Sequence, residues 1–152
     1  VYRKPHIKEV TVRNGSITVR RDAFEGDPIL DAEMLDIGHV LNNVDMEEVG
    51  SKDPYKTLFT MFFKINVAGY EVSHIFANDM QVLRRWLGLP EMVSLGGRIF
   101  GIRVHKDDSI PEDVLLVCGS PQRTSQVGLI QYVVKVSMIE EVEHEAALSE
   151  DS

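Results

Sequence analysis

The chain has 152 residues, of which 43% are hydrophobic, and carries a formal net charge of −8 at pH 7. This length suits one domain with its own core, and no apolar run approaches the roughly 20 residues of a membrane-spanning helix. The acidic balance argues against a general nucleic-acid binder, which needs a basic surface to displace phosphate counterions. The lone Cys118 excludes an internal disulfide.

The charges are unevenly distributed along the chain. Residues 1–21 hold six basic side chains and one acid, whereas residues 138–152 hold six acids and no Lys or Arg. A chain of this kind can pair head to tail with copies of itself, but two unrelated solvated ends would give the same pattern. If the ends pair, the residues expected at the subunit interface are Lys8, Arg13, Arg20, Arg21, Glu140, Glu141 and Glu143.

The first predicted element is a β-hairpin. Residues 7–13 and 17–20 alternate apolar and polar side chains, and Asn14-Gly15 between them favours the positive φ angles of a tight hairpin turn. The hairpin has few bulky apolar residues, so we expect it to project from the body as an arm and to add little to a core. A hairpin folded back on its own domain is the alternative.

Two helices are predicted to follow the hairpin. Each begins with an Asp-Pro pair, Asp27-Pro28 and Asp53-Pro54, in which Asp caps the helix and Pro fits its first turn. The first helix should extend to about residue 44, with one apolar stripe formed by Leu30, Met34, Ile37, Leu41 and Val44. The second should extend to about Val67 and be largely buried, because more than half of its circumference is apolar. The apolar residues of this second helix are Leu58, Phe59, Met61, Phe62, Phe63 and Ile65.

Buried strands and a short helix are predicted in the second half. Residues 72–77 read as a strand, Asn78 as the cap of a helix, and 98–104 as one strand. Residues 114–117 read as a strand buried on both faces, 119–122 as a loop and 127–139 as a long strand. The core is expected to consist of Leu58, Phe62, Phe63, Ile75, Leu83, Trp86, Ile102, Leu115 and Val117.

The sequence contains no pattern typical of a catalytic or metal site. The five histidines lack metal-ligand spacing, and Cys118 has no Cys or His near it in the sequence. Gly96-Gly97 and Gly101 match neither a phosphate-binding loop nor a dinucleotide motif, because no Lys-Ser/Thr follows and a strand comes next. We therefore expect no catalytic residues, no cofactor-binding residues and no metal ligands.

Four parts follow one another between residues 70 and 117. The strand His74-Ile75-Phe76-Ala77-Asn78 leads into a helix containing Leu83 and Leu87. The strand Gly97-Arg98-Ile99-Phe100-Gly101-Ile102-Arg103-Val104 follows, and then the turn and strand Ile110-Pro111-Glu112-Asp113-Val114-Leu115-Leu116. This order of parts resembles the axial domain of a tailed-phage major capsid protein, and the resemblance implies an α+β fold of the Hong Kong 97 type, shared with encapsulins. It would consist mainly of the axial domain, with a preceding β-hairpin arm and a late return strand.

The resemblance also implies a function. The chain would be a structural, non-enzymatic subunit that self-assembles into an icosahedral shell around viral DNA or, if it is encapsulin-like, protein cargo. Its partners would be copies of itself, with packaged DNA or cargo touching the inner wall without sequence-specific contacts, and no cofactor or membrane. Its place would be the virion, after assembly in the host cytoplasm.

The expected organisation has three parts. Residues 1–26 form the hairpin arm, 27–140 a compact α/β body, and 141–152 an acidic, flexible C-terminal end. The competing interpretation is a small soluble α/β ligand-binding domain or an accessory phage protein that forms no shell. The size of the purified particle separates these interpretations.

Overall fold

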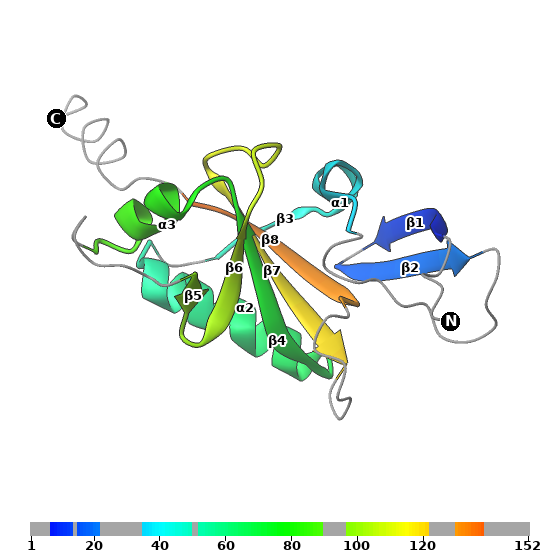
Figure 1. Cartoon of the computed structure of the whole chain (residues 1–152). Helices are drawn as coiled ribbons and strands as arrows, with labels where there is room; N and C mark the ends of the chain where they lie inside the picture. The colour runs from blue at the N-terminus through cyan, green and yellow to red at the C-terminus, as the bar shows by residue number, and fades with distance from the viewer. Residues whose placement is uncertain are drawn as a thin grey trace, which may run out of the picture.

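The computed structural model describes residues 7–13, 15–21, 35–49, 52–89, 97–121 and 130–138. Within these ranges the chain forms helices and one eight-stranded sheet, which confirms the predicted α+β class (Figure 1). The strand order is β1-β2-β8-β7-β4-β6-β5, and β3 pairs with β8 outside this path. The helices are α1 (Ile37–Asn43), α2 (Pro54–Val67) and α3 (Met80–Trp86). The strands are β1 (Ile7–Arg13), β2 (Ser16–Arg21), β3 (Met46–Glu47), β4 (Tyr70–Ala77), β5 (Arg98–Ile99), β6 (Ile102–Lys106), β7 (Val114–Pro121) and β8 (Tyr132–Ser137).

Strand β7 lies at the centre of the sheet. It pairs antiparallel with both β4 and β8, and every residue from Val114 to Ser120 is buried. The prediction of a strand buried on both faces is therefore confirmed. The prediction that a loop begins at residue 119 is wrong, because Gly119 and Ser120 still belong to β7 and pair with β4.

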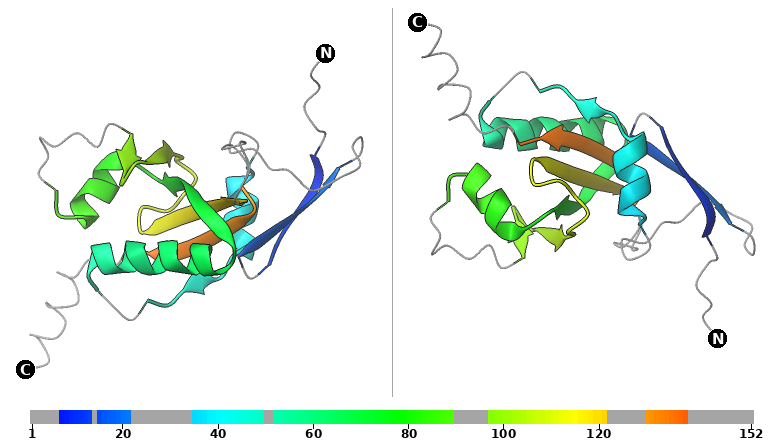
Figure 2. Two further views of the ribbon diagram at one scale, coloured as in Figure 1. Left: turned by 90° about the horizontal axis from the view of Figure 1, so that it is seen from below. Right: turned by 90° about the horizontal axis from the view of Figure 1, so that it is seen from above.

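Two groups of buried side chains cover the two faces of the sheet. On one face α2 lies along the sheet (Figure 2). Its residues Leu58, Met61 and Ile65 pack against β4, β7 and β8. On the other face α1 and the β1–β2 hairpin pack against Phe76, Leu116 and Cys118. Of the predicted core, Leu58, Ile75, Leu83, Leu115 and Val117 are fully buried, whereas Phe62, Trp86 and Ile102 are half-buried and Phe63 is exposed.

Helix α2 has the predicted ends. Asp53 caps it by accepting a hydrogen bond from the backbone N–H of Tyr55 at 2.9 Å, and Pro54 occupies the first helical position. The prediction that the helix is largely buried is wrong. Its apolar residues form two stripes, and only one of the two meets the sheet; Phe59, Phe63 and Val67 remain exposed.

Helix α1 is shorter than predicted. Asp36 has an extended backbone and caps the helix by accepting from the N–H of His39 at 3.1 Å, so the helix begins at Ile37. The predicted start at Asp27 and Pro28 lies outside the described residues. The buried face contains Val40, which the predicted stripe omitted, in addition to Ile37 and Val44.

The segment around α3 differs from the sequence prediction in two details. Asp79, not Asn78, caps the helix, because the Asn78 side chain instead donates to the carbonyl oxygen of Ile110 at 2.9 Å. The single strand predicted at 98–104 is a hairpin of β5 and β6, joined by a two-residue turn at Phe100 and Gly101. The turn arises because both residues have positive φ angles.

The β1–β2 hairpin forms as predicted, and its two ends differ. The turn end joins the body: Val133 donates from its N–H to the Gly15 carbonyl oxygen at 2.6 Å, and Val12 and Ile17 are buried beside α1. The other end extends away from the body (Figures 1 and 2). The expectation that the hairpin adds little to the core is therefore wrong, because its two β-branched residues nearest the turn face inward.

Candidate functional site

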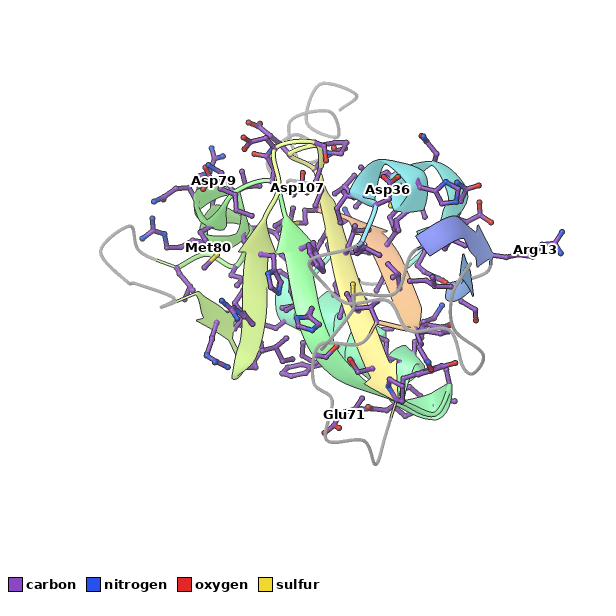
Figure 3. The ribbon with its side chains drawn as sticks, turned by 45° about the vertical axis from the view of Figure 1, so that its right-hand side comes forward. Arg13, Asp36, Glu71, Asp79, Met80 and Asp107 are labelled. Atoms are coloured by element: carbon purple, nitrogen blue, oxygen red, sulfur yellow. The ribbon has the colours of Figure 1, made fainter. Side chains whose placement is uncertain are left out.

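The structure separates the basic residues that the sequence placed at a subunit interface. Arg13 is exposed beside the hairpin turn and points away from the body (Figure 3). Arg20 and Arg21 lie at the opposite end of the hairpin, where they pair with Glu9 and Ile7 in the strand register. The backbone of Lys8 lies in β1, at an irregularity of the pairing. Glu140, Glu141 and Glu143 lie outside the described residues, so the predicted pairing of the two ends stays a prediction.

The most distinct surface of the described residues is apolar and lies on α2. Phe59, Phe63 and Val67 are spaced four residues apart and are 53%, 68% and 69% exposed. Phe100, in the β5–β6 turn, is 53% exposed and lies beside them, with its ring centroid 5.3 Å from that of Phe59. We call these four residues the aromatic ridge. Its three α2 residues lie outside the buried stripe of that helix, which consists of Thr57, Leu58, Met61 and Ile65.

The aromatic ridge is held in place by ring contacts at its base. The ring of Phe100 also meets Tyr55 and Phe62 edge to face, at centroid distances of 6.1 and 6.4 Å. Phe59 meets Phe62 in the same way at 6.1 Å. Edge-to-face pairs of this kind contribute about 0.5–1.5 kcal/mol beyond the area they bury. The ridge is therefore an ordered surface that joins α2 to the β5–β6 turn.

Phe100 occupies a strained backbone position. Its φ angle is 50°, and the following Gly101 has a φ angle of 78°. A two-residue hairpin turn with both φ angles positive favours Asn or Gly at the first position, and a left-handed conformation costs other residues about 1–2 kcal/mol. Strain of this order persists where the surroundings hold it, and it is common at functional sites. The turn therefore keeps an aromatic side chain on the surface at a cost in stability.

Two histidines meet on the face of the sheet opposite α2. The Nδ1 of His74 in β4 lies 2.9 Å from the Nε2 of His105 in β6, and the ring of Phe76 stacks on His105 at a centroid distance of 4.7 Å. In such a hydrogen bond one ring donates and the other accepts, so at least one of the two imidazoles is neutral. Burial lowers the pKa of His105, and the nearby charges of His74 and Arg103 lower it further.

Cys118 is the cross-strand partner of His74 in the β4–β7 pairing. Its side chain is fully buried, and this burial raises the pKa of the thiol. The thiol is therefore protonated at neutral pH, which makes it a poor nucleophile. The described residues contain no group of three His, Cys, Asp or Glu side chains arranged to hold a metal ion.

Comparisons of the chain with protein-family models, with curated proteins and with solved structures found no match. In the part of the chain that the structure describes, no helix has the length and apolar character needed to cross a membrane.

Sequence reasoning missed the aromatic ridge, although the signal was present. Leu58, Met61 and Ile65 form one helical stripe, and Phe59, Phe63 and Val67 form a second at a spacing of four residues. A helix that is apolar on two sides is either buried on both or leaves one free for another partner. The sequence did not show that the sheet covers only one side.

Proposed function

We propose that this chain is a structural subunit of the Hong Kong 97-type shell fold that self-assembles into an icosahedral capsid-type shell. The observation that carries the proposal is the succession β4, α3, the β5–β6 hairpin and β7. The resemblance in the sequence implies a strand, a helix, one further strand and then a turn and strand, and the structure has the β5–β6 hairpin in place of the one further strand. Strands β6, β4 and β7 are neighbours in one sheet, which supports the proposal. A late strand that pairs with β7 also supports the proposal: β8 (Tyr132–Ser137) lies within the predicted range 127–139 and is shorter than the long return strand that the resemblance implies.

In this role the chain is non-enzymatic and needs no cofactor. It encloses viral DNA or protein cargo, which contacts the inner wall without sequence specificity. The net charge of −8 supports this role, because an acidic wall repels phosphate and leaves packaged DNA free to move. The subunits assemble in the host cytoplasm and reside in the virion.

Electron microscopy of the purified protein, combined with light scattering, tests the proposal. We expect closed hollow particles of uniform size, because a shell of fixed symmetry contains a fixed number of subunits. Irregular aggregates would not meet this expectation. A monomer at every concentration would contradict the proposal and favour the small soluble ligand-binding or accessory protein.

A further inference from the structure

We propose that the aromatic ridge is a contact surface for a second copy of this chain, with the two α2 helices packed antiparallel across a twofold axis. This inference rests on the proposed function, for which it names one of the subunit contacts. The ridge consists of Phe59, Phe63, Val67 and Phe100, all more than half exposed. Closed icosahedral shells contain twofold axes, and a contact on such an axis uses the same patch on both copies.

The area of the ridge fits a contact between two copies. Since a buried aromatic side chain contributes about 150–250 Å², the exposed parts of the three Phe side chains amount to roughly 350 Å² per copy. Two facing ridges would then bury roughly 700 Å² from these rings alone, and Val67 adds to it. A standard interface buries about 1,600 Å², of which somewhat more than half is apolar. The ridge therefore supplies most of the apolar centre that such an interface needs.

The composition of the rest of the described surface indicates that the ridge of one copy meets the ridge of the second copy. Among the residues whose side-chain exposure the structure describes (12–13, 15–17, 35–49, 52–89, 97–121 and 130–138), the one large apolar side chain exposed outside the ridge is Met46. An apolar patch gains most by meeting another apolar patch, because polar groups facing it would lose water without hydrogen-bond partners. On a second copy, the apolar patch of matching size among residues of described exposure is the ridge itself.

The spacing of the residues and the charges around them select the antiparallel orientation. With Phe63 at the twofold axis, Phe59 of one copy lies opposite Val67 of the other, so the row complements itself. Lys64 is paired with Glu47 in its own chain. Lys56, exposed on the same side of α2, would face its own counterpart in a parallel pair. In the antiparallel pair the two Lys56 residues are about 21 Å apart, given a rise of about 1.5 Å per residue. This separation exceeds the screening length of about 8 Å at physiological ionic strength.

Sedimentation velocity of the full chain over a range of concentrations tests the contact. Phe59→Gln and Phe63→Gln should each raise the dissociation constant about tenfold or more, because truncation of an aromatic anchor at the centre of an interface is costly. Met46→Gln, the same kind of change outside the ridge, should leave association unchanged. Circular dichroism melts at low concentration check that each variant folds, which we expect because these side chains are exposed.

The orientation has its own test by disulfide trapping. A mixture of Phe59→Cys and Val67→Cys copies should give disulfide-linked pairs on mild oxidation, whereas either variant alone should give none. Cys118 does not interfere, because its side chain is fully buried. Linkage between two Phe59→Cys copies, or none in the mixture, would overturn the antiparallel arrangement.

The outcomes separate this inference from the proposed function. If the chain forms shells and Phe63→Gln does not weaken them, the contact is overturned and the shell function stands. If the chain stops at a dimer that Phe63→Gln dissociates, the contact stands and the shell function is overturned. A chain that is monomeric at every concentration overturns both.

Discussion

At the scale of single residues, one hydrogen bond limits the charge that His74 and His105 can hold. One of the two nitrogens, Nδ1 of His74 and Nε2 of His105, carries the proton and donates it in a hydrogen bond to the other. A proton on both rings would break this bond and place two positive charges side by side, with the Arg103 guanidinium nearby. Desolvation and these charges therefore lower the pKa of His105 from its ordinary 6.5.

This lowered pKa predicts how stability depends on pH. In the unfolded chain His105 binds a proton near its ordinary pKa, whereas in the folded chain it binds one only at lower pH. Between these two values the unfolded state holds more protons, so the free energy of unfolding falls as pH falls below about 6.5. Above that value His105 is neutral in both states, so it no longer changes the free energy of unfolding with pH. Urea unfolding at a series of pH values measures the slope. His105→Gln should make the slope shallower in this window, and an unchanged slope would contradict the assignment.

At the scale of elements, the distance between α2 and the sheet depends on a glycine. A Cβ atom on Gly119 in β7 would lie 2.7 Å from the Cγ2 of Ile65 in α2 and 3.0 Å from the Cβ of Tyr70 in β4. Both neighbours are fixed, since Ile65 is fully buried and the ring of Tyr70 stacks on that of Tyr132 at 5.3 Å. The helix can lie this close to β7 because position 119 has no side chain.

The substitution Gly119→Ala should therefore destabilise the chain by about 1–3 kcal/mol, the usual cost of overpacking a core. Gly38→Ala in α1 is the matched control. The nearest atom to its new Cβ is the Oδ1 of Asp36 at 3.5 Å, so we expect a gain of up to about 1 kcal/mol from helix propensity. Urea unfolding of both variants measures the two differences. Equal stabilities for the two variants would show that the α2–β7 spacing is adjustable.

At the scale of the whole molecule, charged groups gather at separate places. Asp36, Asp79 and Asp107 lie along one end of the sheet, Glu71 lies at the opposite end, and Arg13 projects from the hairpin at the side (Figure 3). The hairpin shares the sheet with the body through β8, so its position relative to the sheet is fixed at the turn end. A partner would therefore meet a basic hairpin held in a defined direction.

Charge reversal of Arg13, Arg20 and Arg21 to Glu tests whether the basic hairpin contributes to assembly. We expect weaker association of the triple variant at low salt, and a smaller difference at high salt because exposed charges are screened. Each exposed pair contributes only about 0–1 kcal/mol, but a shell repeats it in every subunit. Light scattering of variant and wild type at both salt concentrations measures the effect. Equal assembly in all four samples would mean that the two charged ends are independently solvated.

Local chemistry made several elements predictable. The Asp53-Pro54 pair sets the start of α2, Gly15 has the positive φ angle that the hairpin prediction requires, and the run of apolar residues in β7 predicts burial on both faces. These features need only neighbouring residues. The candidate site was less predictable, because exposure of Phe59, Phe63 and Val67 depends on which side of α2 meets the sheet.

The sequence by itself determined the α+β class, the hairpin, the extent of α2 and the burial of Ile75, Leu83, Leu115 and Val117, because periodicity and capping act within one element. Only the tertiary structure decided the contacts between distant segments. It buried Val12 and Ile17 of the hairpin, brought His74 next to His105, and placed Phe100 beside Phe59. It also left the second apolar stripe of α2 uncovered, since the sheet buries only the side of a helix that it touches.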